Sequence, residues 1–307
     1  SGDSNELNES IRQFPFTAEE AFRDSTKSSL FNIAKIYEQI EYNQDLYPQP
    51  VVRGNFVWVD GKQDTSVIFK PDINGRFRVS WMPPAGLRNK MDLERGKKSP
   101  GNDWLGVGGV DSYDLDATVD GRGSKGAFHL YNKFNMEYPS NMFVVEYASR
   151  PPLARIFYED VLMAAVFYGY KILIENNKYG IARYFEMRGY DEYLMDRPEH
   201  LKSTARVTVK TKGIPSNSQD VIQAHAQAIE SYIHEYVGMD ENGNYQPMYF
   251  NRTLEDWINF RIDNRTQYDL TISSGLALLA AQRVKKKKVK KDNTDKTFFR
   301  KGKIIQR

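Results

Sequence analysis

The spacing of hydrophobic residues changes twice along the first hundred residues. Thr17 and Glu20 form an S/T-x-x-E capping box that predicts the start of a helix, and apolar residues recur with helical spacing over residues 30–40. The pattern then becomes β-rich, in three runs separated by turn sequences at 60–61 and 71–75. These runs cover residues 51–59, 66–70 and 77–82.

A second pattern begins at residue 104. It predicts three strands, a helix, a strand and a helix, at residues 105–111, 127–134, 142–149, 152–170, 171–176 and 179–189. Three successive strands followed by a helix-strand-helix alternation favour an α/β fold, in which a mixed sheet is flanked by helices. This is the RNase H-like order. A long helix at 219–237, a shorter one from Thr253 and an apolar one after Asp269 complete the pattern.

These patterns suggest three parts. Residues 1–100 are expected to form an N-terminal helical and β-hairpin appendage, in which the Pro-, Gly- and charge-rich segment 83–103 serves as a linker. Residues 101–283 are expected to form the RNase H-like domain. Residues 284–307 are expected to be a basic, disordered tail.

Composition narrows the functional classes. The chain has 307 residues, 40% of them hydrophobic, which is enough for a sizeable core. It has no cysteine, so disulfides, thiolate zinc sites and a cysteine nucleophile are excluded. No apolar run reaches the roughly 18 residues of a membrane span, and the polar start is unlike a signal peptide. We therefore expect a soluble intracellular protein with no membrane partner.

The net charge of +3 conceals an uneven distribution. Residues 284–307 hold eleven Lys and Arg against two Asp, a local charge of +9, so the rest of the chain carries −6. Runs of lysine recruit phosphate by releasing counterions, although a solvated tail without a role has the same composition. The tail residues that we expect to contact DNA are Lys285, Lys286, Lys287, Lys288, Lys290 and Lys291.

Three acidic residues stand where an apolar run ends or a helix begins. Asp111 closes one predicted strand, Glu175 closes another, and Asp269 opens an apolar helix. Carboxylate oxygens are the ligands that Mg²⁺ and Mn²⁺ prefer. A pair of such ions, about 4 Å apart, can hold both the attacking and the leaving oxygen of a phosphodiester. The trio therefore predicts a nuclease that uses two Mg²⁺ or Mn²⁺ ions.

Each of these residues also has an ordinary structural interpretation. An Asp at a strand end is commonly a turn former, and Asp269 alone is more typical of a helix cap than of a ligand. Glu175 is different, because a carboxylate that ends an apolar strand is costly to bury unless a cation compensates it. Asp114, Asp116 and Asp120 follow the first strand and are candidates for a fourth ligand through water, although solvated loop carboxylates are the more usual case.

The ordered set of motifs resembles a known family. Residues 15–22 resemble the segment after the ATPase domain in large terminase subunits of tailed double-stranded-DNA bacteriophages. The strand ending at Asp111, the strand and helix over 144–168, the strand ending at Glu175 and the helix after Asp269 resemble the nuclease domain of that family. The resemblance covers residues 10–285. It implies that Asp111, Glu175 and Asp269 are the catalytic metal ligands and that double-stranded viral DNA is cut during packaging.

One family feature is missing from this sequence. No Walker A loop is present, and the G-x-G-x-x-G at residues 121–126 precedes a β-like run instead of opening a helix. We therefore expect no ATPase in this chain, which would be a nuclease domain taken from a longer motor protein. The resemblance further implies as partners the ATPase domain of the full-length chain, the portal and the small terminase subunit. It implies a location in the host cytoplasm and, transiently, on the procapsid.

Two other functions stay open. A cellular RNase H-like resolvase or transposase-type nuclease would cut branched DNA at symmetric positions. A non-catalytic DNA-binding or portal-docking module would have a structural trio and would bind no Mn²⁺. The four histidines show no zinc spacing, and His225 and His234 are expected at the surface or boundary of the long helix.

Overall fold

The structure is a computed structural model that describes residues 31–94, 96–114, 125–176, 179–198, 212–215 and 219–282. The helix expected after Thr17, the glycine-rich segment 121–124 and the basic tail lie outside these ranges. So do Asp116 and Asp120, two of the candidates for a fourth metal ligand.

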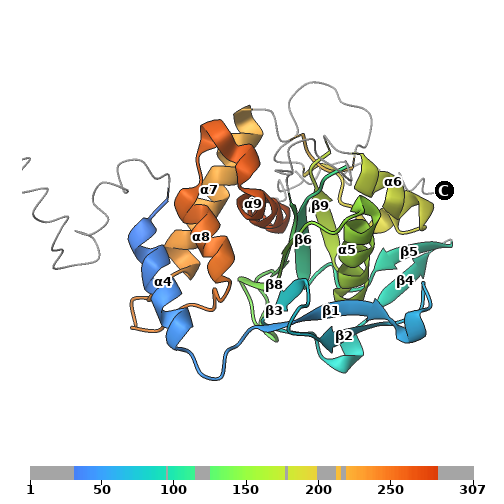
Figure 1. Ribbon diagram of the computed structural model, residues 1–307, viewed down its shortest axis with the longest axis horizontal. Coiled ribbons are helices and arrows are strands. Elements are labelled where there is room, and N and C mark those ends of the chain that lie inside the picture. The colour runs from blue at the N-terminus through green and yellow to red at the C-terminus, as the bar shows by residue number, and fades with distance from the viewer. Residues whose placement is uncertain are drawn as a thin grey trace, which may run out of the picture.

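A seven-stranded sheet forms the centre of the molecule, with the strand order β2-β1-β3-β8-β7-β6-β9 (Figure 1). All neighbours pair antiparallel except β6 and β9, which are parallel. The strands are β1 Val52–Trp58, β2 Val67–Pro71, β3 Phe77–Val79, β6 Gly106–Asp111, β7 Gly126–Asn132, β8 Met142–Ser149 and β9 Lys171–Ile174.

The path of the chain through β6 to β9 gives the sheet its RNase H-like order. β6, β7 and β8 follow one another as antiparallel neighbours, and helix α5 (Ala154–Tyr168) then returns the chain to place β9 beside β6. Leu194 and Ile214 add isolated parallel bridges beside β9. The α/β class and the RNase H-like order expected from the sequence are confirmed.

Helices cover both faces of the sheet. α5 and α6 (Gly180–Met187) lie on one face and share a core with β1, β2 and β3 (Figure 1). The other face is covered by α9, and α7, α8 and α4 pack around it to form a second core. These helices are α4 Ile33–Asp45, α7 Gln219–Tyr236, α8 Asn251–Asn259 and α9 Asp269–Ala281. Among the described residues, no helix is long and apolar enough to cross a membrane.

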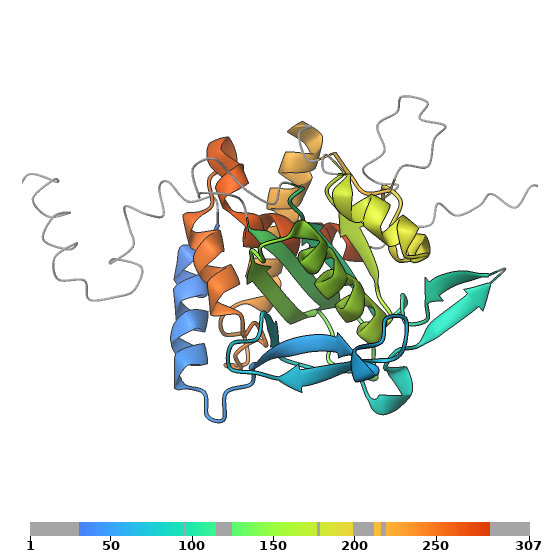
Figure 2. The same cartoon turned by 45° about the vertical axis from the view of Figure 1, so that its right-hand side comes forward.

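Segment 83–103 differs from the expected linker. It contains a short 3-10 helix and a β-hairpin formed by β4 (Met91–Glu94) and β5 (Lys97–Pro100), which projects from the body (Figure 2). The sheet is also continuous across residue 100, because β3 pairs with β8. The expected boundary at residue 100 therefore has no counterpart in the sheet.

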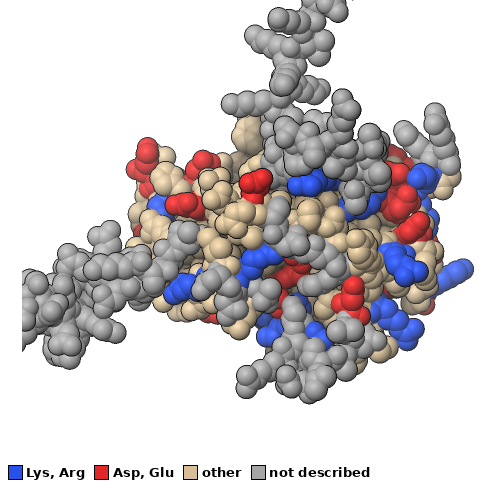
Figure 3. All heavy atoms as spheres, turned by 90° about the horizontal axis from the view of Figure 1, so that it is seen from above, with Lys and Arg blue, Asp and Glu red and all other residues tan. Residues whose placement is uncertain are grey.

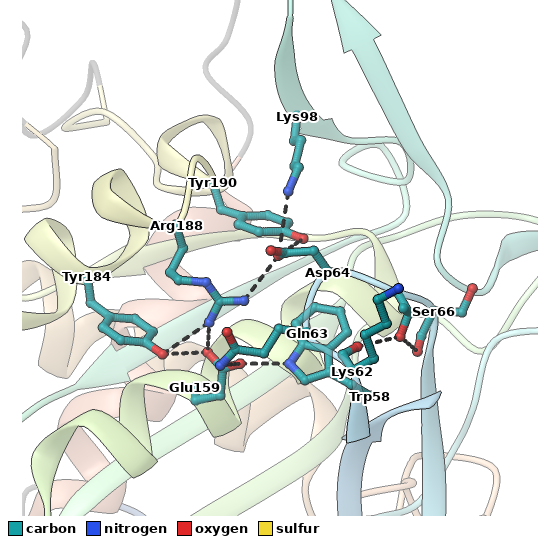
Figure 4. A network of polar contacts seen from close by, with 11 residues as sticks. Trp58, Lys62, Gln63, Asp64, Ser66, Lys98, Glu159, Tyr184, Arg188 and Tyr190 are labelled. Atoms are coloured by element: carbon teal, nitrogen blue, oxygen red, sulfur yellow. Dashed lines mark hydrogen bonds and ion pairs between the residues drawn. The ribbon is translucent and has the colours of Figure 1, made fainter. Parts of the chain in front are cut away.

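A polar network ties the turn after β1 to the helices (Figure 4). The Arg188 guanidinium donates to Asp64 at 3.0 Å and to Glu159, which also accepts the Trp58 indole N–H at 2.6 Å. Burial raises the pKa of Asp64, but hydrogen bonds from Tyr190 and Arg188 outweigh it and leave that pKa below its ordinary value. The N-terminal strands are thus joined to α5 and α6 by charge as well as by packing.

Helix α9 approaches β6 closely because β6 carries glycine at the crossing point. A Cβ on Gly109 would lie 2.2 Å from the Ser273 carbonyl oxygen and 2.3 Å from the Ala277 nitrogen. Both of these are backbone atoms of α9, which a change of rotamer cannot move. Gly109 therefore sets the distance between the helix and the sheet.

We expect Gly109→Ala to lower the free energy of unfolding by about 3 kcal/mol, the upper range for overpacking a core. The added methyl group must push α9 away from the sheet. Gly86→Ala is the matched control, since a Cβ there meets nothing within 4 Å. Urea unfolding of both variants measures the difference, and equal stabilities would contradict the close packing of α9 on β6.

Candidate functional site

Asp111 and Glu175 are brought together by the parallel pairing of β6 and β9. Val110 is the register partner of Ile174, and the Glu175 N–H donates to the Val110 carbonyl at 3.3 Å. Asp111 and Glu175 each follow these partners by one residue, so they are neighbours at the same edge of the sheet. Both are buried, with 4% and 8% of their surfaces exposed.

The alternation of side chains assigns both carboxylates to the face covered by α9. Val107 on β6 and Leu173 on β9 belong to the core on that face, while Val110 and Ile174 belong to the core beneath α5. Residues two apart on a strand share a face. Asp111 and Glu175 therefore have the same orientation as Val107 and Leu173.

Asp269 is the first residue of α9, and it lies near the same ends of the strands, on the face of the sheet that α9 covers. His129 on β7 is the register partner of Gly109 on β6, and its side chain contacts Ser273 of α9. Toward the Asp111 end, the Lys125 backbone N–H donates to Asp269 Oδ2 at 2.8 Å. Along β6, Asp111 comes two residues after Gly109, a distance of about 6.6 Å. Along α9, Asp269 comes four residues before Ser273, a distance of about 6 Å.

The three backbone positions therefore converge, although the side chains do not form a ready-made metal cluster. Within the described ranges, no group of three or more His, Asp or Glu side chains is arranged to hold an ion. Three carboxylates nevertheless match the oxygen chemistry of Mg²⁺ and Mn²⁺. The donor set fits such a metal, and binding requires these side chains to turn toward one another.

Asp114 has a different role. The exposed Asp114 Oδ1 accepts the Tyr158 hydroxyl at 2.9 Å and the Gly180 backbone N–H at 3.2 Å. Gly180 is the first residue of α6, so the carboxylate satisfies an amide at a helix N-terminus. These contacts agree with a structural carboxylate and direct Asp114 toward α5 and α6.

A buried polar chain runs from the sheet to the first turn of α9. Glu146, paired with Arg78 at 3.3 Å, accepts the Thr253 hydroxyl at 2.7 Å. His129 Nε2 lies 2.8 Å from Thr253 Oγ1, and Nδ1 lies 2.9 Å from Ser273 Oγ. Because the Thr253 proton goes to the carboxylate, His129 Nε2 must donate to Thr253 and Nδ1 accepts from Ser273. Burial lowers the pKa of His129 to about 3.

Two further residues hold the same turn from other helices. Asp256 Oδ2 on α8 accepts both the backbone N–H and the hydroxyl of Thr271, each at 2.7 Å. Burial raises the pKa of Asp256 to about 6, although the two Thr271 bonds oppose the rise. His225 Nε2 on α7 donates to the Ile272 carbonyl at 3.0 Å, and burial lowers the pKa of His225 to about 4.

The expectation that His225 lies at the surface or boundary of its helix is wrong, whereas His234 is exposed as expected. The His225 ring occupies the space above Gly275, where a Cβ would lie only 2.1 Å from Nε2. Sequence reasoning also missed His129, Thr253 and Asp256. The spacing of Thr253 and Asp256, which puts both on one face of α8, was the available signal.

The surface on this side of the molecule has mixed charge. In the view from above, Lys and Arg are interspersed with Asp and Glu on the described surface (Figure 3). A pocket of about 470 Å³ lies between the end of β7, α7 and the end of α9. It does not include any of the three candidate carboxylates.

Comparisons with known proteins give matches among solved structures. No family model matches the chain, and no curated protein matches it in sequence. The chain is similar to the large terminase nuclease of the thermophilic phage G20c with bound zinc, at 12% identity and a TM-score of 0.41 over 67% of this chain and 88% of that one. A second structure of the large terminase nuclease from G20c aligns at 10% identity and a TM-score of 0.40, over 67% and 89%.

Proposed function

We propose that the protein is a metal-dependent endonuclease that cleaves double-stranded DNA by hydrolysing phosphodiester bonds. The supporting observation is the convergence of Asp111, Glu175 and Asp269 from β6, β9 and α9 on one edge of an RNase H-like sheet. The three lie far apart in sequence, and their residue type matches the ligands of Mg²⁺ and Mn²⁺.

Each of the three carboxylates would have a role set by its position. Asp111 lies between the other two, so its carboxylate would face both metal positions, and Glu175 and Asp269 would each hold one side. Two bound Mg²⁺ or Mn²⁺ ions would supply the charge that polarises the attacking water and neutralises the phosphate. The chain contributes geometry and negative charge, and no covalent intermediate is needed. Because backbone contacts carry no base information, cleavage should show weak sequence preference.

The biological setting is a further part of the proposal and rests on the ordered motifs in the sequence. They favour cleavage of viral DNA during genome packaging, in company with an ATPase domain of the same full-length chain, the portal and the small terminase subunit. In this setting the protein would act in the host cytoplasm and, transiently, on the procapsid. The basic residues after position 284 would add affinity for DNA without sequence preference.

Plasmid cleavage tests the proposed activity. Purified protein with Mn²⁺ or Mg²⁺ should nick and then linearise supercoiled plasmid, leaving 5′ phosphates, and EDTA should stop the reaction. Branched DNA is the control substrate, because symmetric cutting of a junction in preference to plasmid would identify a resolvase instead. Full activity in EDTA would contradict the metal requirement.

One observation favours a second candidate, a non-catalytic DNA-binding module. The described side chains do not form a metal cluster, which is what a purely structural trio would show. Calorimetric titration with Mn²⁺ separates the two functions. The endonuclease should bind Mn²⁺ with or without DNA. The binding module should bind DNA but no Mn²⁺.

A further inference from the structure

The first turn of α9 is held by hydrogen bonds from three different elements. His129 on β7 contacts Ser273, Asp256 on α8 contacts Thr271, and His225 on α7 contacts Ile272. These three partners are consecutive residues of α9, two to four positions after Asp269. We call His129, Asp256 and His225 the α9 frame.

The α9 frame acts on the turn that begins at Asp269. Ser273, which contacts His129, stands about one helical turn after Asp269. Asp256 accepts the Thr271 backbone N–H, one of the amides that have no partner inside the helix. Tyr268, the residue before the helix, makes no side-chain capping bond, so Asp256 from α8 supplies the cap.

Packing alone does not fix how far α9 slides along the sheet. The face that α9 turns to β6 crosses Gly109, which has no side chain, and its own residues there are small or aliphatic. Hydrogen bonds are directional, so they define a position that such a surface does not. A site whose ligands come from three elements needs each of them held within about 0.5 Å.

We propose that Asp256, His129 and His225 are positioning residues, which fix the first turn of α9 so that Asp269 meets Asp111 and Glu175. The role rests on the proposed function, because it concerns the same metal site. Asp256 allows the sharpest test of this role, because the backbone N–H and the hydroxyl of Thr271 both donate to the same oxygen, Oδ2. An asparagine carbonyl can accept the same two bonds without the charge.

The test compares Asp256→Ala with Asp256→Asn in the full chain. Asp256→Ala should weaken Mn²⁺ binding about 10-fold, which is typical when a group that orients a metal ligand is lost. It should also speed hydrogen exchange of the amides of residues 270–273. Asp256→Asn should stay within about 2-fold of wild type in both measurements, because it keeps the contacts to Thr271.

Ser274→Ala is the matched control. It removes the Ser274 partner of the Trp257 indole, another buried hydrogen bond between α8 and α9, at 3.0 Å. It should lower stability without changing Mn²⁺ affinity, which separates positioning from general loosening. If Asp256→Ala does not fold, Ser273→Ala replaces it, because that change removes the hydroxyl joining His129 to α9.

Three outcomes would overturn the proposal. Wild-type Mn²⁺ affinity in Asp256→Ala would show that the cap does not position Asp269. Equal weakening by Asp256→Asn would show that the charge of Asp256 matters and that its contacts do not. Absence of Mn²⁺ binding by the wild-type protein would contradict the proposed function itself, and with it the positioning role, and this is seen without any variant.

Discussion

Asp111→Asn should reduce DNA cleavage more than about 100-fold, because removing a direct ligand should cost more than losing an outer-shell partner. In the proposed site Asp111 is the central carboxylate, so its loss would affect both metal positions. Asparagine has the same shape and removes one negative charge from a crowded edge. The thermal unfolding temperature should therefore be similar or higher. Plasmid cleavage and differential scanning calorimetry measure the two effects.

Asp103→Asn is the control for this substitution. Asp103 lies near the opposite end of β6, where its carboxylate is 3.7 Å from Lys171. Its replacement should leave cleavage unchanged, because the site is at the other end of the strand. If Asp111→Asn retained cleavage in a preparation free of contaminating nuclease, the assignment of the site would be wrong.

Acidification from pH 7 to pH 4.5 should lower the free energy of unfolding by about 5 kcal/mol through His129 and His225 alone. Burial holds their pKa values near 3 and 4, whereas an unfolded chain takes up these protons near pH 6.5. The stability they provide is therefore lost as pH falls below 6.5, at about 1.4 kcal/mol per histidine per pH unit. Asp256 opposes this loss by about 2 kcal/mol, since its pKa of about 6 lies above the unfolded value.

The net loss is a large share of the 5–15 kcal/mol that stabilises a typical domain. Urea unfolding at pH 7 and pH 4.5 measures it for the wild type and for His225→Gln, in which the difference should shrink by about 2.4 kcal/mol. His234→Gln is the control, because His234 is exposed on the same helix. A His225→Gln protein with the wild-type difference between the two pH values would show that His225 is not buried in the neutral form.

Much of the fold could be predicted from the sequence, because it depends on local periodicity. The strands that became β6, β7, β8 and β9 and the helices α5, α7 and α9 begin and end within a few residues of the expected positions. The hairpin β4–β5 was missed because its charged residues show no apolar alternation. The pairing of β3 with β8 was missed because strand partners separated by some 70 residues leave no local signal.

The candidate site also has some residues with a local sequence signal and others without one. Asp111, Glu175 and Asp269 could be named because each marks the end of a strand or the start of a helix. The α9 frame could not, because its hydrogen bonds join residues 15 to 144 positions apart. Gly109 of β6 was visible in the sequence. Read as a place where a helix approaches a strand closely, it would have predicted the packing of α9.

The most direct test is a crystal of the protein soaked in Mn²⁺ and measured for anomalous scattering. The proposed function predicts two anomalous peaks about 4 Å apart, enclosed by Asp111, Glu175 and Asp269. It also predicts that these peaks are missing from crystals of Asp111→Asn treated in the same way. Peaks elsewhere on the molecule, or no peak at this edge of the sheet under conditions in which the protein cuts DNA, would contradict the metal site.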